Sequence, residues 1–207
     1  MLFSLCVIEA SFAQTRWVWQ NPLPQGNTLY GVKFVDANIG MAVGELGTII
    51  RTTDGGTNWT VQTCVIDQDL LGLSFVDANT ATAVGANGAI LRSNDGGMSW
   101  SSQTSGTART LRSVSFVDAN VGYAVGDIGT ILRTTNGGAN WTSQPSGTTR
   151  DLYGVSFTHA DTGTAVGANG TILRTTNGGM TWILQTSGTI FSLRAVFFLS
   201  MPILLQQ

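Results

Sequence analysis

Short apolar runs separated by turn residues fill this chain, and one stretch shows the pattern clearly. Residues 111–117, L-R-S-V-S-F-V, alternate between apolar and polar positions as a half-buried strand does. The segments 122–126, 130–134 and 141–144 are equally short, and Asp, Asn and Gly residues lie between them. We therefore expect four short antiparallel strands joined by tight turns over this stretch.

The same pattern returns every 41 residues along the chain. Two aromatic positions keep this spacing: Phe34, Phe75, Phe116, Phe157 and Phe198, and Trp59, Trp100, Trp141 and Trp182. The complete repeats are residues 29–62, 70–103, 111–144 and 152–185. Four short strands in each repeat predict an all-β fold, a β-propeller with four complete blades. A solenoid of β-units is the alternative, and the strand count favours the propeller over it.

The first strand of each repeat carries a pair of apolar residues that we expect to point into the core between blades. The pairs are Val32 and Phe34, Leu73 and Phe75, Val114 and Phe116, and Val155 and Phe157. The second strand carries a small Ala-Val-Gly segment in every repeat, as at residues 124–126. We interpret all of these positions as structural.

An octapeptide forms the turn between the third and fourth strands. It reads T-T-D-G-G-T-N-W from Thr52 and resembles the Asp-box, or BNR repeat, with the pattern Ser/Thr-x-Asp-x-Gly-x-x-Trp. A short Asp or Asn side chain accepts hydrogen bonds from backbone N–H groups of a turn, and glycine tolerates a positive φ. The third and fourth copies carry Asn, which keeps the acceptor oxygen and loses the charge, so we expect a structural role for the motif. Its residues are Thr52, Asp54, Gly56 and Trp59, Ser93, Asp95, Gly97 and Trp100, Thr134, Asn136, Gly138 and Trp141, and Thr175, Asn177, Gly179 and Trp182.

The two ends of the chain depart from the repeat, which occupies residues 14–199. Residues 2–8 are apolar and Ser11-Phe12-Ala13 places small residues at a cleavage site, so we expect a signal peptide over residues 1–13. Residues 16–20 resemble a fourth strand and residues 193–199 a first strand, whereas residues 200–207 form an atypical tail. An incomplete or fragmentary ring is the interpretation that this pattern favours, and a short protein with an improvised last blade is the alternative.

Charge and composition narrow the function classes. Charged residues make up 11% of the 207 residues and the net charge is −2, so no strong field favours nucleic acid as a partner. No apolar run is long enough to span a bilayer in the mature chain. With the leader, the expected location is outside the cytoplasm: periplasmic, thylakoid-lumenal or extracellular.

Four arginines recur at the end of the third strand and form the candidate binding set. They are Arg51, Arg92, Arg133 and Arg174. On a propeller they would form an arc able to hold acidic peptides or carboxylates through bidentate guanidinium contacts. The alternative is a structural role, in which each arginine pairs with its own turn or stacks on its own Trp. Arg109, Arg112, Arg150 and Arg194 are irregular and predict a separate basic patch on one face.

Candidate catalytic and metal-binding chemistry is sparse. His159 is the single histidine, in a turn, and no His or Cys pair has the spacing of a zinc site, so we expect neither a metal nor a cofactor. Cys64 is interpreted as a small apolar residue. Asp-boxes also occur in sialidases, which use a Tyr nucleophile. The tyrosines here, Tyr30, Tyr123 and Tyr153, lie within the repeats and no catalytic constellation accompanies them, so the sequence favours a protein without enzymatic activity.

The whole repeat carries a more specific resemblance. The unit L-Y-G-V-K-F-V-D-A-N-I-G-M-A-V-G-E-L-G-T-I-I-R-T-T-D-G-G-T-N-W from Leu29 resembles those of the photosystem II assembly and stability factor family (Ycf48-like), over nearly all of residues 16–198. The resemblance implies a seven-bladed, non-enzymatic propeller outside the cytoplasm, whose arginine-rich surface holds a protein partner such as a membrane-protein assembly intermediate. A sialidase-like enzyme and a structural repeat of a secreted adhesin are the alternatives.

Overall fold

The computed structural model describes residues 26–198, and the strands in this part form four sheets of four strands each. Every sheet is a meander in which strands consecutive in sequence pair antiparallel. The predicted signal peptide, the predicted strand at residues 16–20 and the tail at residues 200–207 lie outside the described residues.

Each predicted repeat corresponds to one sheet. The first two sheets contain β1 (Leu29–Phe34), β2 (Gly40–Gly44), β3 (Ile49–Thr52) and β4 (Thr60–Val61), then β5 (Leu70–Phe75), β6 (Ala81–Gly85), β7 (Ile90–Ser93) and β8 (Ser101–Ser102). The last two contain β9 (Leu111–Phe116), β10 (Gly122–Gly126), β11 (Ile131–Thr134) and β12 (Thr142–Ser143), then β13 (Leu152–Phe157), β14 (Gly163–Gly167), β15 (Ile172–Thr175) and β16 (Ile183–Gln185). We call these sheets blades 1 to 4.

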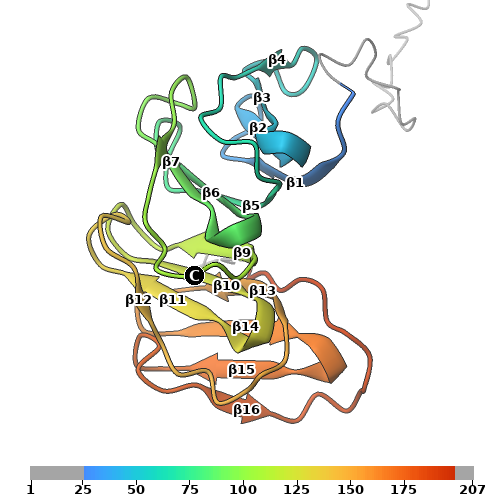
Figure 1. The fold of residues 1–207 in the computed structure, drawn as a ribbon, viewed down its shortest axis with the longest axis vertical. Helices are drawn as coiled ribbons and strands as arrows, with labels where there is room; N and C mark the ends of the chain where they lie inside the picture. Colours follow the sequence, from blue (N-terminus) through green and yellow to red (C-terminus); the bar gives the residue numbers. More distant parts are fainter. Residues whose placement is uncertain (1–25, 199–207) are drawn as a thin grey trace, which may run out of the picture.

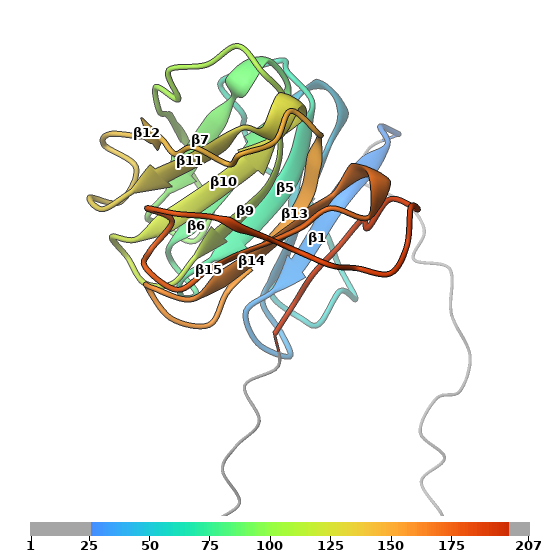
Figure 2. The same ribbon diagram turned by 90° about the horizontal axis from the view of Figure 1, so that it is seen from below.

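The blades follow one another in chain order around an arc (Figure 1). Their first strands, β1, β5, β9 and β13, contact one another in sequence and lie side by side at the inner edge (Figure 2). This is the blade packing of a β-propeller, as the sequence predicts, and the described residues form an arc rather than a closed ring.

Apolar cores lie between consecutive blades. We call the face of a blade that packs on the preceding blade its leading face, and the opposite face its trailing face. Between blades 3 and 4, for example, Val125 and Ile131 on the trailing face meet Leu152, Val155 and Leu173 on the leading face. Interiors of this kind bury each side chain against the neighbouring sheet, so every blade stabilises the next.

The expected orientation of the first-strand apolar pairs is confirmed where a blade precedes. Val114 and Phe116 are buried in the core between blades 2 and 3, and Val155 is buried between blades 3 and 4. Leu73 and Phe75 are half-buried against the core between blades 1 and 2. Val32 and Phe34 are exposed, contrary to the expectation, because no described blade covers the leading face of blade 1.

The link between the second and third strands is a tight turn, as the sequence predicts, and the structure shows that it has 3-10 geometry. The four turns are η1 (Glu45–Gly47), η2 (Ala86–Gly88), η3 (Asp127–Gly129) and η4 (Ala168–Gly170). The middle residue of each has a positive φ: Leu46 at 52°, Asn87 at 55°, Ile128 at 54° and Asn169 at 53°. Asn tolerates this conformation, whereas a β-branched residue such as Ile128 pays a steric cost for it. All four turns lie at the same end of the blades, which we call the η-turn face.

Residues 193–198 do not form the strand that the sequence predicts. The segment instead runs alongside β13, with the Leu193 N–H donating to Gly167 O at 2.9 Å and Ala195 lying against Gly154. It thus holds the place that the first strand of a following blade has, as Arg112 and Ser113 do against Gly72. No described segment follows it to supply a second strand, so no sheet forms there.

Candidate functional site

The four Asp-box turns are held together by their own side chains. In the first, Thr52 Oγ1 accepts from the Gly56 N–H at 2.9 Å, and Asp54 Oδ1 accepts from the Asn58 N–H at 2.9 Å. Gly56 has a φ of 90°, which favours glycine. In the third box Asn136 Oδ1 accepts from the Asn140 N–H at the same distance of 2.9 Å, so the amide oxygen replaces the carboxylate. The boxes are turn scaffolds in this geometry.

The carboxylates of these turns are stabilised in their charged form. Hydrogen bonds from the Ser99 side chain and backbone hold the pKa of Asp95 at about 2. Hydrogen bonds from the Asn58 backbone and side chain likewise lower the pKa of Asp54. A carboxylate saturated by its own turn is a poor general acid or base near neutral pH, which agrees with a structural role.

The Trp that ends each of the last three boxes is buried on the leading face of its blade, in the core shared with the preceding blade. The Trp ring meets the Phe of the first strand edge to face, as Trp141 does with Phe116 at a centroid distance of 5.9 Å. Trp59 with Phe34 and Trp182 with Phe157 form the same contact, at 6.0 and 5.9 Å. In blades 1, 3 and 4 the two aromatic positions that repeat every 41 residues therefore form one structural pair.

The four repeated arginines extend from the trailing faces of their blades. Each lies opposite a second-strand residue: Arg51 opposite Met41, Arg92 opposite Thr82, Arg133 opposite Tyr123 and Arg174 opposite Thr164. Arg92 and Arg51 therefore point toward the next blade, where their guanidinium groups lie beside Gly137 and Gly96, respectively.

Arg92 shows the fullest set of contacts. It is 6% exposed, and its guanidinium donates to Thr82 Oγ1 at 3.0 Å and to Ala119 O of blade 3 at 2.9 Å. Its Cζ lies 4.7 Å from the centroid of the Phe116 ring. Burial lowers the pKa of Arg92, and the charge of Asp77 opposes that shift. Arg92 thus clamps blade 2 onto blade 3, and neither its own turn nor its own Trp is its partner.

The other three arginines make fewer contacts with the next blade than Arg92 does. Arg133 donates to the Tyr123 hydroxyl at 3.2 Å, and that hydroxyl donates to Ala160 O of blade 4 at 2.8 Å. Arg51 is half-buried and its Nε has no hydrogen-bond partner. Arg174, in the last described blade, is exposed. Capture of a partner by this arc stays a prediction.

The irregular arginines gather on the η-turn face. Arg109 donates to Ile128 O at 3.4 Å and Arg150 to Asn169 O at 3.5 Å, both middle residues of η turns. Arg112 forms an ion pair with Asp127 of η3. The predicted basic patch therefore exists, over blades 3 and 4.

Tyr153 contacts two of the arginines on this face, Arg112 and Arg194. The Cζ atoms of Arg112 and Arg194 are 5.3 and 4.6 Å from the centroid of its ring. We call Arg109, Arg112, Arg150, Arg194 and Tyr153 the basic cluster. A sequence signal for this cluster exists outside the column of repeated arginines, because residues 112, 153 and 194 are one repeat apart along the chain.

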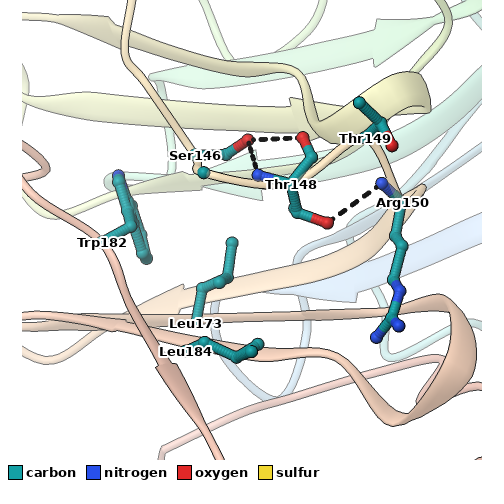
Figure 3. Close-up of a pocket in the computed structure, with 8 residues that line it drawn as sticks. Ser146, Thr148, Thr149, Arg150, Leu173, Trp182 and Leu184 are labelled. Atoms are coloured by element: carbon teal, nitrogen blue, oxygen red, sulfur yellow. Dashed lines mark hydrogen bonds between the residues drawn. The ribbon is translucent and has the colours of Figure 1, made fainter.

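A pocket of about 650 Å³ opens beside the cluster, between the linker to blade 4 and the fourth strand (Figure 3). Trp182, Leu173 and Leu184 form its apolar wall, and the linker around Thr148 forms the polar one. A smaller pocket of about 390 Å³ recurs one repeat earlier beside Trp141. Pockets at this position are therefore a feature of the repeat, which the sequence alone did not indicate.

The residues considered for catalysis lie apart. His159 is exposed, with Nδ1 3.2 Å from Thr158 Oγ1, and Cys64 packs against the core between blades 1 and 2. Tyr30 donates to Glu45 Oε1 at 3.1 Å, but desolvation and the Glu45 hydrogen bond raise the pKa of Tyr30, which works against a tyrosinate nucleophile. Within residues 26–198 no group of three or more acidic, His or Cys side chains is placed to hold a metal ion, and no helix is long and apolar enough to cross a membrane.

Comparisons with known proteins agree with this architecture. The structure of a YCF48 protein bound to D1 peptide matches with a TM-score of 0.69 and 24% identity, covering 86% of this chain and 59% of that one. YCF48 from Cyanidioschyzon merolae matches with a TM-score of 0.64 and 24% identity, over 84% of this chain and 61% of that one. An ancestral GH74 enzyme matches with a TM-score of 0.64 and 20% identity, over 81% of this chain and 25% of that one. The fold is thus shared by YCF48 proteins and by enzymes.

The chain spans about three fifths of the length of the YCF48 structures that it matches. No curated protein sequence matches it. Residues 61–146 match the model of the family described as "Photosynthesis system II assembly factor YCF48". The resemblance of these repeats to the photosystem II assembly factor family is therefore confirmed over residues 61–146, in a chain with the YCF48 fold.

Proposed function

We propose that this protein is an exported, non-enzymatic scaffold that holds a segment of a protein partner on its η-turn face, at the basic cluster. The apolar run at residues 2–8 motivates export, to the periplasm, the thylakoid lumen or the extracellular space. The likeness to a YCF48 protein bound to D1 peptide motivates a peptide-like ligand, such as part of a membrane-protein assembly intermediate.

The observation that carries the proposal is the pair of arginines on Tyr153. The guanidinium groups of Arg112 and Arg194 lie 5.3 and 4.6 Å from one ring centroid, so both cations contact the same side chain. Asp127 pairs with Arg112, whereas Arg194 has no acidic partner among the described residues. A carboxylate that reaches the exposed Arg194 guanidinium would gain charge-assisted hydrogen bonds there.

The distribution of charge on the η-turn face favours an acidic segment of the partner. Over blades 3 and 4 the four arginines outnumber Asp127 and Asp151, whereas the same end of blades 1 and 2 carries Glu45, Asp67 and Asp69. An acidic segment is therefore attracted to the basic cluster and repelled from the other half of the face. The neighbouring pocket with Trp182 and Leu184 provides room for an apolar side chain of the same segment.

A binding titration tests the proposal. Fluorescently labelled D1 peptide is titrated with the wild-type chain and with the double variant Arg150→Gln/Arg194→Gln, and anisotropy reports binding. We expect the double variant to bind at least tenfold more weakly, because both exposed guanidinium groups contribute charge-assisted hydrogen bonds. Arg174→Gln removes an exposed arginine of the arc and serves as the matched control. Equal binding by wild type and double variant would show that the basic cluster is not the site.

A further inference from the structure

Two kinds of residue alternate at the centre of the η turns. The four turns read E-L-G, A-N-G, D-I-G and A-N-G in chain order, and their middle residues are Leu46, Asn87, Ile128 and Asn169. All four have nearly the same φ, between 52° and 55°. Asparagine adopts this left-handed conformation readily, whereas it is unfavourable for leucine and more so for the β-branched isoleucine. The turn thus forms with the favourable residue in blades 2 and 4, and its geometry does not require isoleucine in blade 3.

The hydrogen bonds and packing of the η3 turn do not account for Ile128 either. Its N–H donates to Asp151 Oδ1 at 2.9 Å and its carbonyl accepts from Arg109 Nη1 at 3.4 Å, and asparagine would supply the same backbone groups. Its side chain is 49% exposed and lies outside the apolar cores between the described blades. An exposed apolar side chain held in an unfavourable backbone conformation is a candidate for contact with another molecule.

The surroundings of Ile128 indicate what that molecule carries. Asp127, the residue before it, pairs with Arg112, and Arg109 donates to its carbonyl, so two arginines of the basic cluster lie beside this turn. Ile128 and Arg109 also line the pocket of about 390 Å³ beside Trp141. An acidic segment attracted to these arginines passes next to Ile128, and an aliphatic side chain of that segment is removed from water when it packs there.

We propose that Ile128 is an apolar contact residue of the basic cluster, against which an aliphatic side chain of the acidic partner segment packs. The inference rests on the proposed function and narrows the class of segment, which then carries carboxylates for the arginines and an aliphatic residue close to them. Exposed ion pairs contribute little and are weakened by salt, whereas the aliphatic contact is not screened. Ile128 thus favours binding over the stability of its own turn.

The turns of blades 2 and 4 supply the variant that tests this proposal. Ile128→Asn gives η3 the middle residue that η2 and η4 already have, so the fold is retained. Anisotropy titrations with labelled D1 peptide should show binding about three- to tenfold weaker than that of the wild type, because an aliphatic contact is lost. Urea unfolding should give a midpoint equal to or higher than that of the wild type, because asparagine suits the positive φ.

Unchanged binding of D1 peptide by Ile128→Asn would overturn the proposal. A lower urea midpoint would overturn it as well, because the isoleucine would then have a structural role in the turn.

A second peptide tests the aliphatic nature of the contact. It is the D1 peptide with every aliphatic residue replaced by serine. The wild type and Ile128→Asn should bind this peptide equally, because the side chain that packs on Ile128 is gone. A loss in Ile128→Asn that is as large for the serine peptide as for D1 peptide would contradict an aliphatic contact.

Leu46→Asn is the matched control. Leu46 is 66% exposed in the same turn of blade 1, but Glu45 precedes it and Asp69 accepts from its N–H, so an acidic segment is not attracted there. This variant should bind D1 peptide as the wild type does. A loss equal to that of Ile128→Asn would overturn the proposal, because the effect would not depend on the basic cluster.

The double variant Arg150→Gln/Arg194→Gln separates failure of this inference from failure of the proposed function. If the double variant binds D1 peptide weakly and Ile128→Asn binds it normally, the proposed function stands and the isoleucine contact alone is wrong. If the double variant binds normally, the proposed function itself is wrong, and the inference that rests on it fails too.

Discussion

Arg92 offers the sharpest test of how consecutive blades are held together. Arg92→Ala removes two hydrogen bonds from a charged group, at 3.0 and 2.9 Å, and a cation–π contact at 4.7 Å. Hydrogen bonds to charged groups contribute roughly 1.5–3 kcal/mol each and a desolvated cation–π contact about 2 kcal/mol. Removing a buried charge returns part of its desolvation cost, so we expect a net loss of about 2–4 kcal/mol in the free energy of unfolding.

The repeat itself supplies the control for this prediction. Arg174→Ala changes the same residue at the same position of the repeat, but its side chain is exposed, so the expected change is within about 0.5 kcal/mol. Urea unfolding followed by tryptophan fluorescence and by circular dichroism measures both variants, and coincident transitions verify cooperative unfolding. If Arg92→Ala is no more destabilising than Arg174→Ala, Arg92 is not an inter-blade clamp.

Three further outcomes are expected. Asp95→Asn should flatten the pH dependence of stability below about pH 4. The lowered pKa of Asp95 means that its carboxylate stabilises the fold above the unfolded-state pKa, and this contribution is lost as pH falls toward about 2. Urea titrations from pH 7 to pH 2 measure the free energy of unfolding, and an unchanged profile would contradict the role of the Asp95 turn. A fluorogenic sialoside should show no turnover above background, and turnover that disappears in Tyr30→Phe would instead support an enzyme. Mass spectrometry of the exported protein should find Gln14 at its N-terminus, and a retained Met1 would contradict the leader.

The repeats made the fold predictable because every level of the sequence agrees on it. The alternation in residues 111–117 predicts the strand observed at Leu111–Phe116, and the Asp-box predicts the turn that follows β11. The observed strand ends differ from the predicted ones by one or two residues. The fourth strand of blade 3, for example, is predicted over residues 141–144, and only Thr142–Ser143 pairs. Such local patterns determine which residues pair within a sheet, so the blades can be predicted from the order of residues alone.

The contacts between blades could not be predicted in the same way. The partner of Arg92 is Ala119 O, 27 residues away in the next blade, and no local pattern indicates that pairing. The positive φ of Ile128 follows from the 3-10 turn and from the Asp151 carboxylate, which accepts from the Ile128 N–H, rather than from the propensity of isoleucine. Arg112 and Arg194 contact Tyr153 from two other segments of the chain, and although these residues are one repeat apart, the spacing alone does not indicate that their side chains meet.

The position of the partner on the molecule tests the central claim most directly. A photo-crosslinking amino acid is placed at Thr149, next to Arg150 on the η-turn face, or at Asn94, in the Asp-box turn at the opposite end of the blades; both positions are exposed. After irradiation with D1 peptide, mass spectrometry identifies the crosslinked chain. We predict a crosslink from position 149 and none from position 94. A crosslink from position 94 alone would contradict binding at the basic cluster and would place the partner at the other end of the blades.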